Sequence, residues 1–162
     1  MIRIRPYKDS DAAKILSWCR DEDTYYKWTA GVLGEYPLTE EKFRKTGDLM
    51  RFTALDEKDV AGFFTVRNPN DALDELRFGF VIVDPDKRGR GIGREMLRLG
   101  LQYAFTIYQA KRVTLSVFEN NLPAYACYHA AGFTETGAKE RYVIRGVEET
   151  AVEMEVISCL QD

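Results

Sequence analysis

The glycines and basic side chains best suited to chemistry lie in the segment 84–94, between a predicted buried strand and a predicted amphipathic helix. The strand ends at Asp84, because Pro85 has no N–H group to continue a hydrogen-bonded ladder. Glycine lets the backbone turn sharply and removes side chains that would hold a ligand away. The N–H groups of such a loop point out of the helix N-terminus, where the helix dipole favours an anion. The segment therefore predicts a cradle for a pyrophosphate, with arginines as counter-charge.

The spacing of the glycines distinguishes between the known phosphate loops. A Walker loop ends in Gly-Lys-Ser/Thr, which this segment does not contain. A dinucleotide fingerprint needs a third glycine where this chain has Arg94 or Met96. The spacing that is present, Arg88-x-x-Gly91-x-Gly93 after Val-Asp-Pro, resembles the acetyl-CoA loop of the GNAT superfamily of N-acetyltransferases.

A second segment carries the same resemblance. Asn121 is followed by Ala124, by Tyr128 and by Gly132-Phe133, in the order of a later motif of that family. The two motifs and the strands around them cover most of the chain after the first 49 residues, which resemble the family only in their pattern of elements.

The resemblance implies an acetyl-CoA cosubstrate and gives individual residues a role. In the family the pantetheine arm pairs with the end of the central strand, and a tyrosine that corresponds to Tyr128 protonates the CoA sulfur. Because a phenol has a pKa of about 10 and a thiol one of about 8.5, a hydrogen bond from Tyr128 to the forming thiolate is expected to matter more than full proton transfer. Asn121 is expected to cap its helix and to orient the pantetheine. The residues expected to bind the cofactor are Val81, Val83, Arg88, Gly89, Arg90, Gly91, Ile92, Gly93, Arg94 and Asn121, with Arg90 the arginine expected to be solvated.

The general base stays open at the level of sequence. Neutralising a lysine-type amine, with a pKa of about 10.4, costs roughly 4–5 kcal/mol at neutral pH, whereas an α-amine with a pKa of about 7.7–8.0 costs about 1–1.4 kcal/mol. A lysine or polyamine acceptor therefore needs a base or a water chain more than an α-amine does. Glu75, at the start of the central strand, is the first candidate and Glu119 is the second, although each is equally compatible with a solvated strand-end carboxylate. The branch that acetylates protein N-termini often has a glutamate where this chain has Ser116.

Hydrophobic periodicity predicts the elements that position these residues. They are a short strand at 2–5, helices after Ser10 and Thr39, a hairpin at 52–67, a central strand at 75–83 with a bulge at Gly79, a helix at 93–108, a strand at 113–117, a helix capped by Asn121 and a closing hairpin at 141–157. The order predicts one α/β (α+β) domain over residues 1–162. Its expected architecture is GNAT-like: a mixed, mostly antiparallel sheet of six to seven strands with a splayed central pair, flanked by about four helices.

The segment 21–37 shows no period and is predicted to be a long loop, with at most a helical turn. An aromatic cluster of Trp18, Tyr25, Tyr26 and Trp28 lies beside three acidic residues, where GNAT folds build the acceptor pocket. Aromatic rings with acids suit a cation. Packing of a long loop is the alternative.

Composition excludes several classes of protein. Three cysteines, odd in number and widely spaced, are typical of reduced core residues in a cytoplasmic protein. The single histidine, His129, is predicted on a helix surface and gives little material for a zinc site or a triad, so no metal is expected. A net charge of −3 argues against a nucleic-acid partner, and no apolar run approaches a membrane span. A homodimer through the last strands is compatible with the sequence.

The function expected from the resemblance is transfer of an acetyl group from acetyl-CoA to a primary amine, on a small molecule or a peptide N-terminus, directly in a ternary complex. The alternative is a non-catalytic acyl-CoA-binding regulatory module, against which Tyr128 argues, since a binder needs no hydroxyl at the sulfur. A nucleotide-binding regulatory domain is the third hypothesis, and the failed glycine spacing argues against it.

Overall fold

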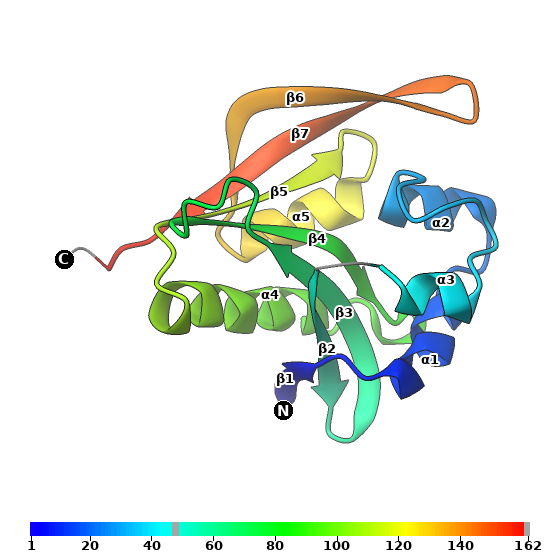
Figure 1. The fold of residues 1–162 in the computed structure, drawn as a ribbon, viewed down its shortest axis with the longest axis horizontal. Helices are drawn as coiled ribbons and strands as arrows, with labels where there is room; N and C mark the ends of the chain where they lie inside the picture. Colours follow the sequence, from blue (N-terminus) through cyan, green and yellow to red (C-terminus); the bar gives the residue numbers. More distant parts are fainter. Residues whose placement is uncertain (47–48, 161–162) are drawn as a thin grey trace.

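The computed structural model describes residues 1–46 and 49–160, which form one sheet with helices on both faces (Figure 1). Within these ranges the sheet has seven strands in the order β1-β2-β3-β4-β5-β7-β6. The strands are β1 (Ile2–Pro6), β2 (Met50–Asp56), β3 (Asp59–Arg67), β4 (Glu75–Val83), β5 (Arg112–Phe118), β6 (Thr134–Ile144) and β7 (Val147–Ile157). Only β4 and β5 are parallel neighbours in this described sheet. The predicted mixed, mostly antiparallel sheet is confirmed.

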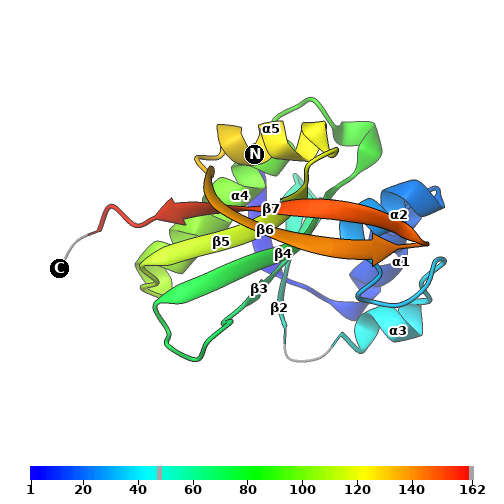
Figure 2. The ribbon, with the colours of Figure 1, turned by 90° about the horizontal axis from the view of Figure 1, so that it is seen from above.

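The helices form two separate groups, with α4 and α5 in one and α1, α2 and α3 in the other (Figure 2). They are α1 (Ala12–Ser17), α2 (Glu22–Thr29), α3 (Glu40–Arg44), α4 (Ile92–Gln102), which a π-helical turn at Tyr103–Ile107 extends, and α5 (Leu122–Ala130). Buried side chains of α4 and α5 pack with one cluster of sheet residues, and those of α1, α2 and α3 pack with a second. Adjacent residues of β3 show the division, since Phe64 belongs to the first cluster and Phe63 to the second.

The centre of the sheet is split between β4 and β5. The two strands pair only from Glu75 to Arg77, opposite Arg112 to Thr114. Farther along, β4 stays on β3 but changes register, because Phe63 faces Ile82 while Thr65 faces Gly79. The extra residue is a β-bulge, and Phe80 has a left-handed φ of 47°. The predicted splayed pair and the bulge next to Gly79 are both present.

The segment predicted as a loop contains a helix instead. Asp21 caps α2 by accepting a hydrogen bond from Thr24 N at 2.7 Å, and Ala30 ends the helix in the left-handed conformation. The buried face consists of Tyr25 and Thr29, one turn apart. Periodicity missed this helix because an aromatic phenol and a threonine, rather than aliphatic residues, make its buried face. The chain therefore has five α-helices in the described ranges, where about four were expected.

The cysteines follow the prediction only in part. Cys19 is buried and Cys127 is half-buried, but Cys159 is exposed, so the expectation of three core residues is wrong for the last one. His129 lies on the exposed side of α5, as predicted. In the described part of the chain, no helix is long and apolar enough to cross a bilayer.

Candidate active site

The split between β4 and β5 opens into a groove of about 1410 Å³. On one face of the sheet it is lined by the loop 87–94 and by α5, and on the other by α2, by α3 and by the polar side chains of β3, β4 and β5. The groove therefore passes from one face of the sheet to the other through the seam. It brings together every residue predicted to bind the cofactor, and Tyr128.

The loop before α4 has the backbone that a cradle requires. Asp84 is buried and accepts a hydrogen bond from Asp86 N at 3.0 Å, which fixes the start of the loop. Gly89 and Gly91 have φ values of 76° and 78°, a left-handed region that side chains disfavour. Gly91 is the N-cap of α4, so the free N–H groups of the first helical turn open into the groove.

The basic side chains of the loop divide into two groups. Arg90 lies 3.7 Å from Asp56, and Lys87 lies 3.6 Å from the same carboxylate, which draws both toward the β2–β3 turn. Arg88 and Arg94 form no ion pair with any residue in the described ranges, and both line the groove. Lys87 and Arg90 line the groove as well. That Arg88 and Arg94, rather than Arg90, face the ligand stays a prediction.

Position 93 requires a glycine for packing, and not for the close approach of a ligand that the spacing suggests. It is buried, and a Cβ added to it would lie 2.9 Å from Cys127 Sγ and 3.4 Å from a methyl group of Val83. Its lack of a side chain therefore allows α4 to pack against α5 and β4. Ile92, its neighbour, is also buried, so its backbone rather than its side chain can serve a ligand.

The bulge presents the free edge of β4 to the groove. Val81 and Val83 lie beyond the last pair with β5, so this edge of the strand has no neighbour there. Trp28 of α2 donates a hydrogen bond from Nε1 to the carbonyl oxygen of Phe80 at 2.8 Å. An element that the sequence predicted as loop thus holds the bulge in place.

Asn121 and Tyr128 lie on the wall that α5 contributes. Asn121 caps the helix by accepting a hydrogen bond from Ala124 N at 3.4 Å, and it lines the groove. The Tyr128 side chain is buried, its hydroxyl forms no hydrogen bond within the described residues, and it lines the groove. Burial raises the pKa of the Tyr128 phenol, and the neighbouring Cys127 thiol raises it further. The hydroxyl therefore stays protonated near neutral pH and is available as a donor.

The two candidate bases lie elsewhere. Glu75 accepts a hydrogen bond from Thr114 at 3.1 Å and pairs with Arg112 at 3.5 Å, at the closed end of the seam. Glu119 pairs with Lys139 at 3.0 Å on the surface. Neither lines the groove, so the structure does not bring them together with Tyr128. Among the described lining residues the only carboxylate is Asp23, on the rim.

The aromatic cluster is divided between packing and the groove. Trp18 and Tyr25 are buried in the second core, which supports the packing alternative for these two. Of the four aromatic residues, only Trp28 lines the groove. Sequence reasoning missed the polar seam below it, where Arg77 donates to Ser116 at 2.5 Å and to Glu153 at 3.2 Å. Arg77 and Ser116 are each flanked by buried residues of their own strand. That local pattern gave no signal for this contact, because the contact joins side chains of three strands.

Comparison with known proteins identifies the family. The model of the acetyltransferase (GNAT) family matches residues 12–133. The chain belongs to this family. It is 38% identical over 91 residues to a spermine/spermidine N(1)-acetyltransferase of Bacillus subtilis, a match that covers 56% of each chain. It is 35% identical over 80 residues to a mycothiol acetyltransferase of Corynebacterium glutamicum, covering 49% of this chain and 26% of that protein.

A solved structure supports the fold over nearly the whole chain. Spermidine N-acetyltransferase from Vibrio cholerae, in complex with CoA and spermine, superposes with a TM-score of 0.78 at 21% identity, covering 96% of this chain and 95% of that one. The chain spans about half the length, or less, of the curated relatives it matches. Those relatives are named for different acceptors, so the family leaves the acceptor of this chain undetermined.

Proposed function

We propose that this chain transfers an acetyl group from acetyl-CoA to a primary amine by direct attack within a ternary complex. The observation that carries the proposal is the groove through the β4–β5 seam. It joins the glycine loop on one face of the sheet to a polar chamber on the other face, with Tyr128 on its wall. A binding module that only held an acyl-CoA would have no need of an opening on the second face.

The loop residues serve the phosphate end of the cosubstrate. The N–H groups at the start of α4, together with Arg88 and Arg94, would hold a pyrophosphate. The free edge of β4 at Val81 and Val83 offers backbone groups to the pantetheine amides, in the manner of an added strand. Asn121 keeps the end of α5 in place beside that arm.

The reaction needs a stabilised oxyanion and a stabilised leaving thiolate. The amine nitrogen bonds to the thioester carbon, the carbon–sulfur bond breaks, and the proton of the amine is lost to solvent. A backbone N–H of the bulged strand, near Val81, polarises the carbonyl. The Tyr128 hydroxyl donates a hydrogen bond to the sulfur as its charge develops. Because the pKa of Tyr128 is raised, this hydrogen bond contributes more than complete proton transfer does.

Removal of the amine's proton is assigned to water in the groove. Glu75 stays a predicted base, but its carboxylate is bound by Arg112 and Thr114 away from the groove. Without an adjacent carboxylate, the enzyme favours amines that are partly neutral at the working pH, since each pKa unit above that pH costs about 1.4 kcal/mol.

The cellular setting remains a set of proposals. The three cysteines of the described chain are free thiols, which suits a reducing compartment, and we place the protein in the cytoplasm. We treat residues 1–162 as one catalytic domain. A homodimer through β6 and β7 stays a prediction.

The direct test is a thermal melt combined with an assay of CoA release. Acetyl-CoA at 100 times its dissociation constant should stabilise the protein by about 2.7 kcal/mol, while NAD at the same concentration leaves the melt unchanged. Amines from a broad panel should then release free thiol from acetyl-CoA. A melt that millimolar acetyl-CoA does not shift would overturn the assignment.

A further inference from the structure

The chamber on the second face of the sheet is rich in cations. Below, the acceptor half of the groove means the lining residues contributed by α2, by α3 and its C-cap Lys45, by the end of β3, by the start of β4 and by β6. Five of its side chains are positively charged: Lys27, Lys42, Lys45, Arg67 and Arg77. Within the described residues the one acidic side chain of this half is Asp23. Such a lining favours an acceptor with negative charge.

Two of these cations have no counter-ion within residues 1–46 and 49–160. Lys27 pairs with Asp23 at 3.3 Å, Lys45 with Glu41 at 2.9 Å, and Arg77 with Glu153 at 3.2 Å. Arg67 and Lys42 form no such pair in these ranges, and both are exposed at the groove. Among the described lining residues, the excess positive charge of the acceptor half therefore comes from Arg67 and Lys42.

Arg67 also lies directly opposite Arg77 in the β3–β4 ladder. Opposite residues of an antiparallel pair project from the same face, and like charges placed there destabilise the sheet. An oxyanion between the two guanidinium groups would remove that repulsion through charge-assisted hydrogen bonds. Arg77 is held by Ser116 and Glu153, so it can act as the fixed side of such a site and Arg67 as the adjustable side.

The pair of Arg67 and Arg77 lies close to the bulge of β4, where the acetyl transfer is proposed to take place. Arg77 precedes Gly79 and the bulge by two residues, which corresponds to about 7 Å along a strand. Tyr142 of β6 also lines this half, and its ring packs edge-on against Phe118 of β5 with centroids 5.5 Å apart. The charges of Arg77 and Arg67 act to lower the pKa of the Tyr142 phenol, although burial first and then Glu140 raise it on balance. Both guanidinium groups therefore act on one small chamber.

We propose that the acceptor is an amine that also carries an oxyanion, a carboxylate or a phosphate, bound by Arg67 and Arg77. The inference rests on the proposed acetyl transfer and names the class of its substrate. A small molecule with its amine and its oxyanion several bonds apart can reach from the arginine pair to the bulge.

The acids near the aromatic cluster give no contrary site for a polycation. Asp21 caps α2, Glu22 pairs with Arg145 at 2.9 Å, and Asp23 pairs with Lys27. Each carboxylate is therefore already engaged. A polyamine, the acceptor for which the Bacillus subtilis relative is named, would meet the positive charges of Arg67 and Lys42, which no carboxylate of residues 1–46 and 49–160 pairs with.

The experiment compares acceptors in matched pairs at saturating acetyl-CoA, with free thiol as the readout. The pairs are lysine with cadaverine, ornithine with putrescine, and phosphoethanolamine with ethanolamine, and spermidine is included. In at least one pair the oxyanion-bearing member should have a kcat/KM about 10- to 100-fold higher than its partner, as expected for one charge-assisted contact. The pair that shows it distinguishes a carboxylate from a phosphate. Higher kcat/KM for spermidine or for the members without an oxyanion would overturn the inference and leave acetyl transfer intact.

A variant pair ties the preference to the site. Arg67→Ala should raise the KM for the preferred acceptor about 10-fold or more while the KM for acetyl-CoA stays constant. Arg3→Ala, at an exposed arginine of β1, is the control and should change neither. An Arg67→Ala enzyme with an unchanged acceptor preference would overturn the inference. If acetyl-CoA failed to shift the melt of the wild-type protein, the proposed function itself would fall.

Discussion

Tyr128 is the residue on which the proposed reaction depends through a single functional group. We predict that Tyr128→Phe lowers kcat by about 100- to 10,000-fold, the usual range for a lost general-acid contact, while acetyl-CoA binding changes little. The phenyl ring keeps the packing of α5, and only the hydroxyl that faces the groove is lost. Steady-state kinetics and calorimetric titration with acetyl-CoA measure the two effects separately.

Tyr125→Phe provides the matched control on the same helix. The Tyr125 hydroxyl donates to Glu135 at 2.8 Å and its ring is not part of the groove lining, so kcat should not change.

The raised pKa of Tyr128 also predicts a stability effect at high pH. The stabilisation is complete below about pH 10, where an unfolded tyrosine is neutral, and it is lost as the pH rises further. Retention of full kcat by Tyr128→Phe would make Tyr128 a packing residue.

Gly93 should respond to substitution as a packing position. We predict that Gly93→Ala destabilises the protein by about 1–3 kcal/mol, the usual cost of overpacking, because the new Cβ meets Cys127 Sγ at 2.9 Å. Denaturant unfolding gives the change in the free energy of unfolding.

A double-mutant cycle tests the cause of that destabilisation. Cys127→Ala removes the sulfur, so adding Gly93→Ala to it should cost less than adding it to the wild type. Gly91→Ala is the contrasting variant, since its new Cβ would come no closer than 3.9 Å to any neighbour and its cost is backbone strain at φ 78°. Additive effects of Gly93→Ala and Cys127→Ala would show that the contact is not responsible.

At the scale of elements, α2 supports the bulge of β4 through one hydrogen bond. We predict that Trp28→Phe lowers both kcat and stability, the latter by about 1–3 kcal/mol for an unpaired carbonyl in addition to the lost volume. The reason is that the Phe80 carbonyl oxygen loses its donor, so the bulge and the free strand edge are less well fixed. Activity assays and unfolding curves give the two values.

Trp18→Phe is the matched control, because it removes the same side-chain volume but breaks no hydrogen bond of the described structure. The Trp18 side chain is buried, and its Nε1 has no hydrogen-bond partner within the described residues. This variant should therefore lose stability through packing alone and keep the kcat of the wild type. Equal losses of kcat in the two variants would contradict a role for the Trp28 hydrogen bond.

The sequence predicted best the elements whose signals are local. The bounds of β4 at Glu75–Val83 and the cap at Asn121 were correct, because a strand stopped by Pro85 and a cap followed by proline are signals that act within a few residues. The prediction of a loop for the segment that forms α2 was wrong, since the buried face of this helix consists of Tyr25 and Thr29 and has no aliphatic side chain. Propensity cannot identify such a face without knowledge of the surface that it packs against.

The same limit applies to the site. The place of the glycine loop and of Tyr128 on the groove could be predicted because each depends on spacing within one segment, while their roles stay predictions. The interpretation of Glu75 used its position at a strand end, but the side chain is bound by Arg112 from the neighbouring strand. The pair of Arg67 and Arg77 depends on the register of β3 with β4, which the sequence alone did not specify.

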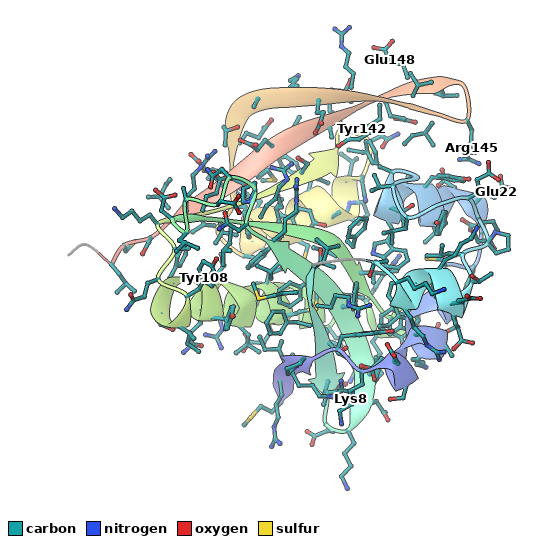
Figure 3. All side chains as sticks on the ribbon, in the orientation of Figure 1. Lys8, Glu22, Tyr108, Tyr142, Arg145 and Glu148 are labelled. Carbon is teal, nitrogen blue, oxygen red and sulfur yellow. The ribbon has the colours of Figure 1, made fainter. Side chains whose placement is uncertain are left out.

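At the scale of the whole molecule, one contact links the closing hairpin to the N-terminal helices. Arg145, near the turn between β6 and β7, lies beside Glu22 of α2 (Figure 3) and pairs with it at 2.9 Å. Its guanidinium group also lies over the ring of Tyr26. With the bond from α2 to β4 and the ladders from β4 to β6, this contact completes a closed ring of elements around the acceptor half.

We predict that Arg145→Ala opens the ring with little loss of stability. An exposed ion pair contributes about 0–1 kcal/mol, so the melting temperature should change by only a few degrees. Hydrogen exchange should become faster at the hairpin turn and in α2.

Arg141→Ala is the matched control, since Arg141 pairs with Glu148 inside the same hairpin at 3.6 Å. Its effect on exchange should stay within β6 and β7. Unchanged exchange in α2 for both variants would show that the hairpin does not restrain that helix.

The passage of the groove through the sheet has a consequence for the order of events in a catalytic cycle. In the proposed reaction, donor and acceptor would approach the split strands from opposite faces, so the entry of one would not block the path of the other. After transfer, the spent thiol and the acetylated amine would leave on those same opposite faces. Sterics therefore impose no sequence on arrival or departure, and whichever product is held less tightly is released first.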